Sequence, residues 1–443
     1  MTATSHPEGG RHSDLVIAGG GLAGASLALA MARALPHRAI TVVESFPLAR
    51  DALPDSYQPS YDARSTALAW GSRQIFQDLG LWSALARQAT PIQHIHVSDR
   101  GRFGATRLAA GDHHQEALGY VVDNRWLGLC LMAALRQCPQ VRWLAPATVE
   151  TVGAEAGVTR VQVRAGDGTL HDLRTQCMVL ADGGRSGLRE QLGFQVERRD
   201  YGQHALIANV STAERHQFTA FERFTDAGPM ALLPHGGPGP ASACTSALVW
   251  TLSPDALDAV MAASPDDRCR QLQQRFGWRL GRFTRMGECS HYPLSLVTVP
   301  EPVRPGVVLI GNAAHALHPV AGQGFNLALR GITALVEQFQ QADARGDALG
   351  SLSTLKVYQQ AHQADWQRTV QFSDSLVQLF GAGVPGLGLA RDAGLVGLDL
   401  VAPAKRWFAR QAMGLGARRP DYHHGQTADA AAGTSGHSIE ERS

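Results

Sequence analysis

The sequence has little of what marks nucleic-acid-binding or membrane-spanning proteins. Its 40 Lys and Arg residues nearly balance 39 Asp and Glu residues, so no net charge favours a nucleic acid as a partner. Lysine is almost missing, with Lys356 and Lys405 alone in the chain, and we attribute the surplus of arginine to codon composition. No apolar run reaches the length that a bilayer-spanning helix needs.

Cysteine is scarce as well, with six residues and no Cys-x-x-Cys pair. The polar start of the chain lacks the apolar core of a secretory signal. We therefore expect no disulfide framework, no metal site and a cytoplasmic protein, with any membrane contact made peripherally at the inner face. The pair His423–His424 is expected to belong to a solvated tail and not to a metal site.

What is present is a long chain of 443 residues, 44% of them hydrophobic, which suits two interleaved domains. An apolar strand pattern at 14–19, a helix pattern of small residues from Leu22 and a second strand pattern at 39–44 predict a β-α-β unit.

The remaining strand patterns are far apart, so the first domain is expected to be built from discontinuous segments. They lie at 161–165, 177–182 and 307–312. The stretch 191–300 shows strand-like alternation and Pro-Gly turns, which predict an inserted sheet, whereas 325–415 is expected to be mostly helical.

A glycine-rich turn joins the first strand to the first helix. Gly19, Gly21 and Gly24 fit the GxGxxG pattern, in which glycines allow a tight turn and let a pyrophosphate approach the helix N-terminus. Glu44 ends the next strand, where a carboxylate can accept a hydrogen bond from a ribose hydroxyl. The two features together predict dinucleotide binding.

Two further motifs follow apolar strands later in the chain. Asp182 opens the sequence DGGRSG, which by itself is also typical of a capped turn. The second motif, GNAAHALHPVAGQGFN at 311–326, runs from a strand end through a Gly-Gln-Gly turn into a helix pattern. Backbone N–H groups at such a turn suit an anion, such as a reduced flavin.

In this order the three motifs resemble those of the FAD-dependent aromatic hydroxylases, a family of flavoprotein monooxygenases, over about residues 12–415. The stretches at 61–72, 119–127 and 317–331 are similar to the ubiquinone-biosynthesis branch, and most similar to its hydroxylases of 2-polyprenyl-6-methoxyphenol. The resemblance implies an α/β fold with a Rossmann-like FAD-binding domain in discontinuous segments, an inserted β-sheet substrate domain and a helical C-terminal region.

The chain departs from the family pattern at three positions. Asn312 stands where the family usually has an Asp that binds the ribityl chain of FAD, but the amide oxygen can still accept a hydrogen bond. The 2-polyprenyl-6-methoxyphenol hydroxylases resemble this chain in having Asn there. Ala328 and Gly331 replace the usual Gly and Asp of the branch, and nothing in the sequence explains them.

The resemblance implies a set of FAD-binding positions. Arg64 would lie near the flavin or its phosphates, Asn124 would contact FAD with Arg125 as its competitor, and Asp182 would serve FAD and the nicotinamide donor. The full set of expected cofactor-binding residues is Gly19, Gly21, Gly24, Glu44, Arg64, Asn124, Asp182, Asn312, Pro319, Gly322, Gln323 and Gly324.

The resemblance also implies the reaction. NADPH or NADH would reduce FAD, and O2 would then give a flavin 4a-hydroperoxide that hydroxylates the ring of a prenylated phenol. Because the cofactor supplies this chemistry, we assign no catalytic side chain. His315 and His318 lie in the third motif, and a structural role is the favoured interpretation of His315.

Three alternatives remain open at this stage. The first is a sister ubiquinone-pathway hydroxylase acting on another ring carbon. The second is a hydroxylase of a small soluble aromatic acid, for which Arg223 or Arg285 would bind the carboxylate. The third is a non-catalytic FAD-binding subunit of a biosynthetic complex. A flavin halogenase is disfavoured because the WxWxIP element is missing.

The domain boundaries and the partners complete the expectations. The membrane surface and other ubiquinone-biosynthesis proteins are candidate partners, with the apolar segment 384–416 as either an interfacial patch or an ordinary packed helix. The expected boundaries are 1–12 for a disordered N-terminus, 13–90, 121–190 and 296–345 for the FAD-binding domain, 91–120 and 191–295 for the substrate domain, 346–416 for the helical region and 417–443 for a disordered tail.

Overall fold

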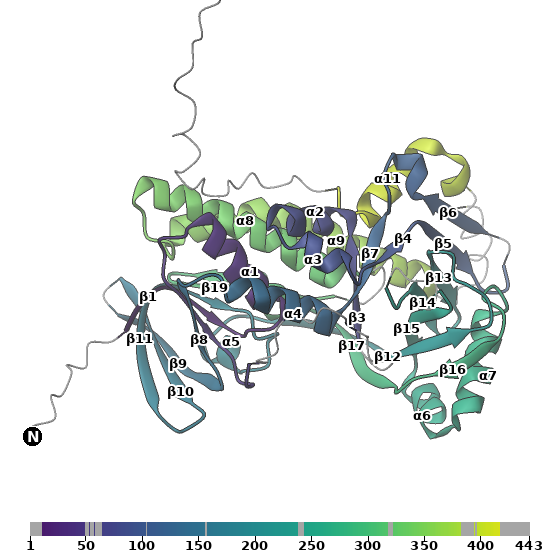
Figure 1. The fold of residues 1–443 in the computed structure, drawn as a ribbon, viewed down its shortest axis with the longest axis horizontal. Helices are drawn as coiled ribbons and strands as arrows, with labels where there is room; N and C mark the ends of the chain where they lie inside the picture. Colours follow the sequence, from purple (N-terminus) through teal and green to yellow (C-terminus); the bar gives the residue numbers. More distant parts are fainter. Residues whose placement is uncertain are drawn as a thin grey trace, which may run out of the picture.

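The computed structural model describes residues 11–48, 53, 57, 64–102, 104–155, 157–237, 243–317, 322–381, 394 and 397–416. Figure 1 shows two lobes side by side, each built around a β-sheet, with long helices running across them. The first strand begins at Arg11, two residues before the expected start of the first domain. The rest of the two segments expected to be disordered, 1–10 and 417–443, lies outside the described residues.

The first lobe contains an eight-stranded sheet whose main path runs β18-β19-β11-β1-β2-β8. The pairs β1–β2, β2–β8, β1–β11 and β11–β19 are parallel, and β9 and β10 extend β11 as an antiparallel hairpin. The strands of this sheet are β1 (Arg11–Ala18), β2 (Ile40–Val43), β8 (Val141–Leu144), β9 (Ala147–Glu155), β10 (Val158–Ala165), β11 (Leu170–Leu180), β18 (Val303–Arg304) and β19 (Val307–Leu309).

Helices cover this sheet because their small and aliphatic residues pack on its parallel strands. Helix α1 packs against α4 and α8, and its residues from Gly24 to Ala32 are almost all buried. The discontinuous α/β fold expected from the sequence is thereby confirmed. The helices and turns of the lobe are α1 (Leu22–Ala34), α2 (Trp70–Asp78), α3 (Trp82–Ala86), α4 (Asn124–Leu135), α5 (Leu188–Gln191), η3 (Gly311–Ala313) and α8 (Gln323–Arg345).

The second lobe contains a nine-stranded sheet with the order β20-β17-β12-β15-β14-β13-β5-β6, and β16 pairs with β12. The strand patterns expected within 191–300 fall in β12 and β15. The strands are β5 (His94–Asp99), β6 (Ala105–Ala109), β12 (Glu197–Thr212), β13 (Thr219–Thr225), β14 (Gly228–Pro234), β15 (Thr245–Leu252), β16 (Phe283–Met286), β17 (Ser290–Thr298) and β20 (His315–Ala316).

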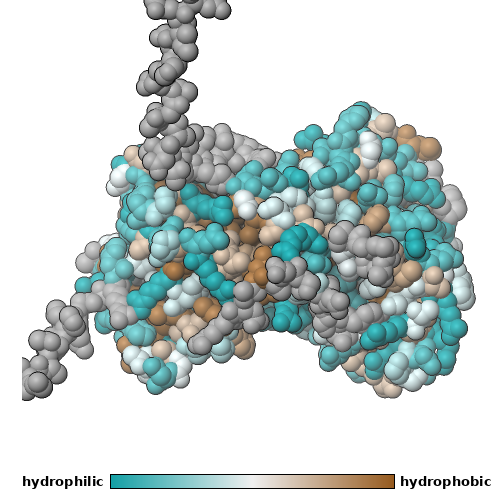
Figure 2. All heavy atoms as spheres, viewed as in Figure 1, coloured by the Kyte–Doolittle hydropathy of each residue, from teal (hydrophilic) through white to brown (hydrophobic). Residues whose placement is uncertain are grey.

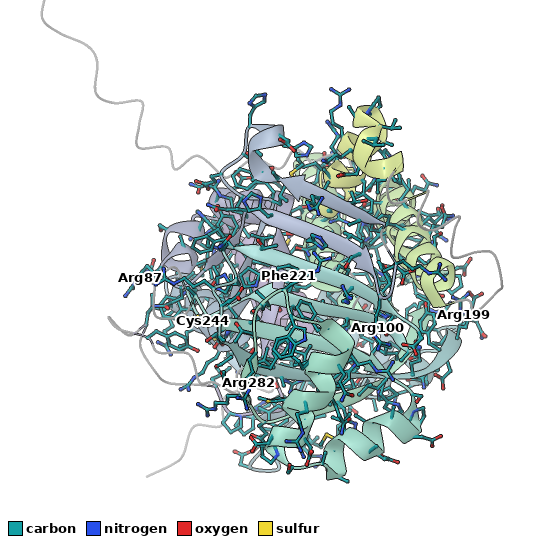
Figure 3. The ribbon with its side chains drawn as sticks, turned by 90° about the vertical axis from the view of Figure 1, so that its right-hand side faces the viewer. Arg87, Arg100, Arg199, Phe221, Cys244 and Arg282 are labelled. Atoms are coloured by element: carbon teal, nitrogen blue, oxygen red, sulfur yellow. The ribbon has the colours of Figure 1, made fainter. Side chains whose placement is uncertain are left out.

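Two helices, α6 (Pro254–Ala262) and α7 (Pro265–Phe276), lie against this sheet, each capped by a serine. Figure 3 looks onto the sheet, with Phe221 of β13 labelled near its middle. Phe221 packs edge to face on Phe276 of α7, with ring centroids 5.6 Å apart. The face of β13 that carries Phe221 is therefore covered by α7, and the opposite face is left for other contacts.

A small sheet and two C-terminal helices connect the lobes. Strands β3 (Ser65–Ala69), β4 (Thr90–Ile92) and β7 (Gly119–Asp123) form an antiparallel sheet, and η1 (Ala110–His113) precedes β7. Helix α9 (Leu352–Gly381) packs against α8 and also contacts β13 and β14. Helix α11 (Ala402–Ala412) lies at the top of the second lobe in Figure 1, and the helical region expected at 325–415 is confirmed where the chain is described.

Candidate functional site

The three sequence motifs meet at one edge of the first sheet. They follow β1, β11 and β19, which are adjacent and parallel, so their carboxyl ends lie together. The N–H of Ala181 donates to the carbonyl of Ala18 over 2.8 Å, and that of Ile310 donates to Leu180 over 3.0 Å. Ligands of open α/β sheets bind at this kind of edge.

The first glycine turn is too tight for side chains. Gly19 has φ +101°, and a Cβ there would lie 2.7 Å from the carbonyl oxygen of Ala181. A Cβ on Gly24 would lie 1.9 Å from the carbonyl oxygen of Gly19. Both positions therefore need glycine to bring α1 close to the strand ends.

Gly21, between these two glycines, has a different role. A Cβ on Gly21 would meet no atom within 4 Å, and the residue lines a cavity. Gly21 is the N-cap of α1, and no side chain caps the helix there. The first N–H groups of α1 and the positive end of its dipole are thus available to an anionic group in the cavity.

Glu44 braces the glycine turn from the end of β2. One carboxylate oxygen accepts from the N–H of Gly20 over 2.7 Å, and the other accepts from the N–H of Phe46 over 2.9 Å. The side chain also lines the cavity. The Ser45 hydroxyl also donates to the oxygen that binds Phe46, over 3.2 Å. The oxygen that binds Gly20 keeps a second lone pair, so Glu44 can hold the turn and still accept from a ribose hydroxyl.

Asp182 organises its own turn. Its carboxylate accepts from the N–H of Gly184 over 2.9 Å and from the N–H of Ser186 over 2.9 Å, and the Ser186 hydroxyl donates to it as well. These bonds match the capped-turn interpretation of this motif. Asp182 and Gly183 also line the cavity, so the turn brings both backbone and carboxylate to its wall.

The third motif brings a second uncapped helix to the cavity. Gly322, with φ +60°, is the N-cap of α8, and no side chain caps it. Asn312 on η3, Gln323 and Gly324 line the cavity, and a Cβ on Gly324 would meet no atom within 4 Å. Pro319 lies outside the described residues.

Asn326 holds this turn in place, a role that the sequence did not reveal. Its amide oxygen accepts from the N–H of Ala69 over 2.8 Å and from the hydroxyl of Ser72 over 2.7 Å. Its amide nitrogen donates to the carbonyls of Ala67 and Gly322 over 2.9 and 2.8 Å. With all four bonds satisfied, the buried amide fixes β3 and α2 against the start of α8.

Arg64 and Asn124 line the same cavity. Asn124 accepts from the hydroxyl of Thr66 over 2.5 Å and lines the cavity, whereas its competitor Arg125 is not among the lining residues. Arg64 also lines the cavity. Burial raises the pKa of Tyr292 on β17, and the nearby Arg64 guanidinium opposes that rise.

A single cavity of about 1600 Å³ runs from these motifs to the second sheet, more than the roughly 300–1,000 Å³ of common ligand pockets. Figure 2 shows apolar residues gathered in the hollow between the two lobes. The far wall is lined mainly by aliphatic side chains, with one carboxyl group, that of Glu222. The aliphatic members include Ile95, Val97, Ile207, Leu233 and Val249.

The residues at the cofactor end fit FAD. Gly21 and Gly324 leave open space where a Cβ would otherwise project, and each lies at the start of a helix without a side-chain cap. Two such helix ends suit a pyrophosphate and the anionic form of a flavin. Individual contacts with FAD remain predictions for all twelve expected residues.

Two histidines of the cofactor lobe are buried together. Burial lowers the pKa of His315 to about 3, with His362 as a second cause, and lowers the pKa of His362 to about 4. Their ring centroids are 5.8 Å apart. A neutral, packed His315 agrees with the structural role favoured for it, and His318 lies outside the described residues.

The arginines proposed for an aromatic acid do not reach the cavity. Arg223 lies on the α7 side of β13 and donates to Ser98 over 3.4 Å, and Arg285 belongs to the edge strand β16. Neither is among the lining residues.

Within the described ranges, no group of three His, Cys, Asp or Glu residues is placed to hold a metal ion.

Comparisons with known proteins agree with this geometry. A family described as FAD binding domain matches residues 12–373. The chain is 33% identical over 402 residues to the ubiquinone hydroxylase UbiL of Rhodospirillum rubrum, covering 91% of this chain and 90% of that protein. It is 28% identical over 408 residues to the 3-demethoxyubiquinol 3-hydroxylase of Escherichia coli, covering 91% and 99%.

Solved structures share the fold at lower identity. The p-nitrophenol 4-monooxygenase PnpA of Pseudomonas putida has a TM-score of 0.74 and 17% identity, covering 92% of this chain and all of its own. PqsL of Pseudomonas aeruginosa, solved with 2-aminobenzoylacetate, has a TM-score of 0.70 and 22% identity, covering 87% of this chain and all of its own. At these identities the likeness concerns the fold.

Proposed function

The chain belongs to the FAD-binding-domain family, and on that premise we propose that it is an NAD(P)H-dependent hydroxylase of a polyprenylated phenol in ubiquinone biosynthesis. The reaction consumes NAD(P)H, a proton and O2, and it yields NAD(P)+, water and a hydroxylated ring. FAD, when bound, supplies the redox chemistry, while the protein binds, orients and shields the reactants.

The observation that carries this proposal is the continuous cavity. Its cofactor end has two open helix N-termini, and its other end is an aliphatic wall suited to a greasy substrate. One binding space can therefore hold both reactants side by side. We assign the twelve residues expected from the sequence, from Gly19 to Gly324, to the cofactor end.

Among substrates we favour a 2-polyprenyl-6-methoxyphenol, because the resemblance described above implies that its hydroxylases have Asn at the position of Asn312. The main alternative is a sister hydroxylase that acts on another ring carbon. One relative is named as a 3-demethoxyubiquinol 3-hydroxylase, which supports keeping that alternative.

Metabolite profiling of a deletion strain tests the proposal. We expect the strain to lose ubiquinone and to accumulate a polyprenylated ring that lacks one hydroxyl group, and the bare carbon identifies the position. Complementation with the intact gene is the control. Normal ubiquinone in the deletion strain contradicts the proposal.

The other two alternatives make different predictions. A non-catalytic subunit would retain FAD but oxidise no NAD(P)H with any phenol offered. A hydroxylase of aromatic acids is disfavoured because Arg223 and Arg285 lie away from the cavity, whose far wall carries Glu222 instead. A carboxylate substrate would gain no ion pair from that wall.

We also propose that α11 rests on an anionic membrane surface from which the substrate is taken. Its inner face carries Phe408, which lines the cavity, and Ala409, which is buried in the core. Its outer face exposes Trp407 and Arg410, beside the exposed Leu400. A helix with packed and exposed apolar faces and basic residues suits an interface.

Vesicle co-sedimentation tests the membrane proposal. Trp407→Ser should weaken binding to vesicles of phosphatidylglycerol and phosphatidylcholine several-fold, because an exposed aromatic anchor is lost. Trp278→Ser is the matched control, since Trp278 is also an exposed tryptophan but lies beyond the end of α7. Equal binding by both variants contradicts this assignment.

Among the helices of the described part, none has the length and hydropathy to cross a bilayer.

A further inference from the structure

The far wall of the cavity is one face of the nine-stranded sheet. Side chains alternate along a strand, so Ala220, Glu222 and Phe224 of β13 share the cavity face while Phe221 and Arg223 share the other. Glu222 thus stands between two apolar neighbours on its own strand.

The neighbouring strands surround Glu222 with aliphatic side chains. Its register partner on β5 is Val97, and its partner on β14 is Ala231. The next residue along that row of the sheet is Val249 of β15. All three line the cavity, so the carboxyl group is the polar exception in an apolar row.

In the part of the chain that the structure describes, the elements packed over this wall bring no counter-charge to it. Phe372 of α9 and Phe408 of α11 line the same cavity. The nearby charges on those helices are engaged elsewhere, since Asp374 binds Arg199 and Tyr201, and Lys405 binds Asp399 over 3.1 Å. On β5, His96 faces the opposite side and lies 2.9 Å from Arg279. Within the described residues, the carboxyl of Glu222 has no hydrogen bond or ion pair.

Such an environment is costly for a carboxylate. Burial alone raises the pKa of Glu222 to about 8. A desolvated ionisable group without a partner costs free energy that an apolar side chain would not. A carboxyl group with a shifted pKa in a ligand cavity is a candidate catalytic or substrate-binding group. The side chain of Glu222 faces the cavity, where a ligand can reach it.

We propose that Glu222 receives the ring hydroxyl group of the phenol substrate, as its hydrogen-bond acceptor and as the base that takes its proton. This inference rests on the proposed function. The O–H bond of the phenol breaks, the proton moves to a carboxylate oxygen, and the electron pair stays on the phenol oxygen. The resulting electron-rich ring is the form that an electrophilic oxygen attacks most readily, and a base with a pKa near the working pH suits this transfer.

Ligand binding to the FAD-loaded enzyme tests this role without turnover. The probes are 2-prenylphenol, which carries one five-carbon prenyl group, and its O-methyl ether, in which a methyl group replaces the hydroxyl proton. Each is titrated from pH 6 to pH 9 in the absence of NAD(P)H, with the change in flavin fluorescence as the readout. The ratio of the two dissociation constants, ether over phenol, measures the contribution of the hydroxyl proton.

For the wild type we expect this ratio to rise about tenfold as the pH passes 8, because an ionised acceptor binds a hydroxyl group more strongly than a neutral one. In Glu222→Gln the ratio should be flat, since the amide does not titrate. In Glu222→Leu it should be flat and close to one. Val249→Ala, on the same row, should weaken both probes alike and keep the rise.

Several outcomes separate this inference from the proposed function. A rise with pH that persists in Glu222→Gln overturns the assignment of Glu222. A flat ratio in a wild-type enzyme that oxidises NAD(P)H with the phenol also overturns it, but leaves the proposed function standing. If the wild-type enzyme binds neither probe and oxidises no NAD(P)H with either, the assignment of Glu222 and the proposed function are both overturned. Circular dichroism and flavin content confirm that each variant is folded.

Discussion

At one end of the cavity the chain presents backbone, and at the other it presents side chains. Gly21 and Gly324 leave the first N–H groups of α1 and α8 open at the cofactor end. At the substrate end, side chains such as Val97 and Val249 come from strands far apart in the sequence and meet only through the register of the sheet.

The two constructions differ in what they tolerate. Backbone can be offered to a ligand only where no side chain intervenes, so the cofactor end is sensitive to a single added group. A wall of side chains changes shape gradually when one apolar residue replaces another. We therefore expect the glycines at the cofactor end to tolerate no larger residue, and the apolar residues at the substrate end to tolerate replacement by other apolar residues.

The strongest test of this contrast is Gly324→Val. The added side chain meets no protein atom within 4 Å at its Cβ, so the protein should fold, but the space proposed for the flavin is filled. We expect purified protein to lose FAD by at least about tenfold. Gly128→Val in α4 is the matched control, because that Cβ also meets nothing and lies outside the cavity lining. Full flavin content in Gly324→Val removes this turn from the flavin site.

The next test concerns the stability that the protein loses by burying the carboxyl group of Glu222 at the substrate end. The pKa of Glu222 is raised from 4.5 to about 8, so the folded state holds a proton that the unfolded state has lost. Stability therefore falls as the pH rises from about 4.5 to about 8 and then levels off. The advantage in unfolding free energy of Glu222→Gln over the wild type should therefore grow by about 1–3 kcal/mol from pH 5 to pH 8.5. We set this range below the full linkage value because the side chain borders an open cavity.

Urea unfolding at the two pH values measures that gain. Glu301→Gln, at an exposed position, is the control and should change stability by less than about 0.5 kcal/mol at either pH. If the advantage of Glu222→Gln is the same at both pH values, the carboxyl does not titrate in a buried setting and the contrast weakens.

A smaller effect is expected at the brace of the first glycine turn. Glu44→Ala removes the acceptor for the N–H of Gly20 and the proposed acceptor for the ribose hydroxyl. Loss of such charge-assisted bonds should raise the dissociation constant for FAD about tenfold, as measured by titrating the apoprotein with FAD. Unchanged affinity would mean that the turn holds its shape without Glu44.

The smallest effect should come from the adjustable wall. Leu233→Met keeps the volume of a cavity-lining side chain, so flavin content should not change and stability should shift by less than about 1.5 kcal/mol. The dissociation constant for 2-prenylphenol should change only slightly. A large loss of FAD from this variant would contradict the separation of the two ends.

The sequence was sufficient for the fold class and for the edge where the motifs meet. Each motif is contiguous and follows a parallel strand, so local patterns placed Gly19, Asp182 and Asn312 at neighbouring strand ends. The competition between Asn124 and Arg125 needed the structure, because only the geometry at the start of α4 shows which side chain lines the cavity.

The substrate wall could not be predicted in the same way. Val97, Ala231 and Val249 become neighbours of Glu222 through pairings between β5, β13, β14 and β15. The alternation in TAFERFT allowed either face of β13 to point inward, so Glu222 and Arg223 were equivalent in the sequence. Asn326 was also missed, because its four partners lie in segments up to 259 residues away.

The order of the strands sets when the protein can acquire its cofactor. β1 pairs with β11, whose last paired residue, Leu180, follows about 160 residues after it, and β11 pairs with β19 at Leu309. Contacts of such long sequence separation form late, and α8, which supplies the second helix end, follows later still. A growing chain on the ribosome thus has no complete flavin site until residues beyond 324 have emerged. On the proposed assignment, FAD then stabilises the finished chain by mass action.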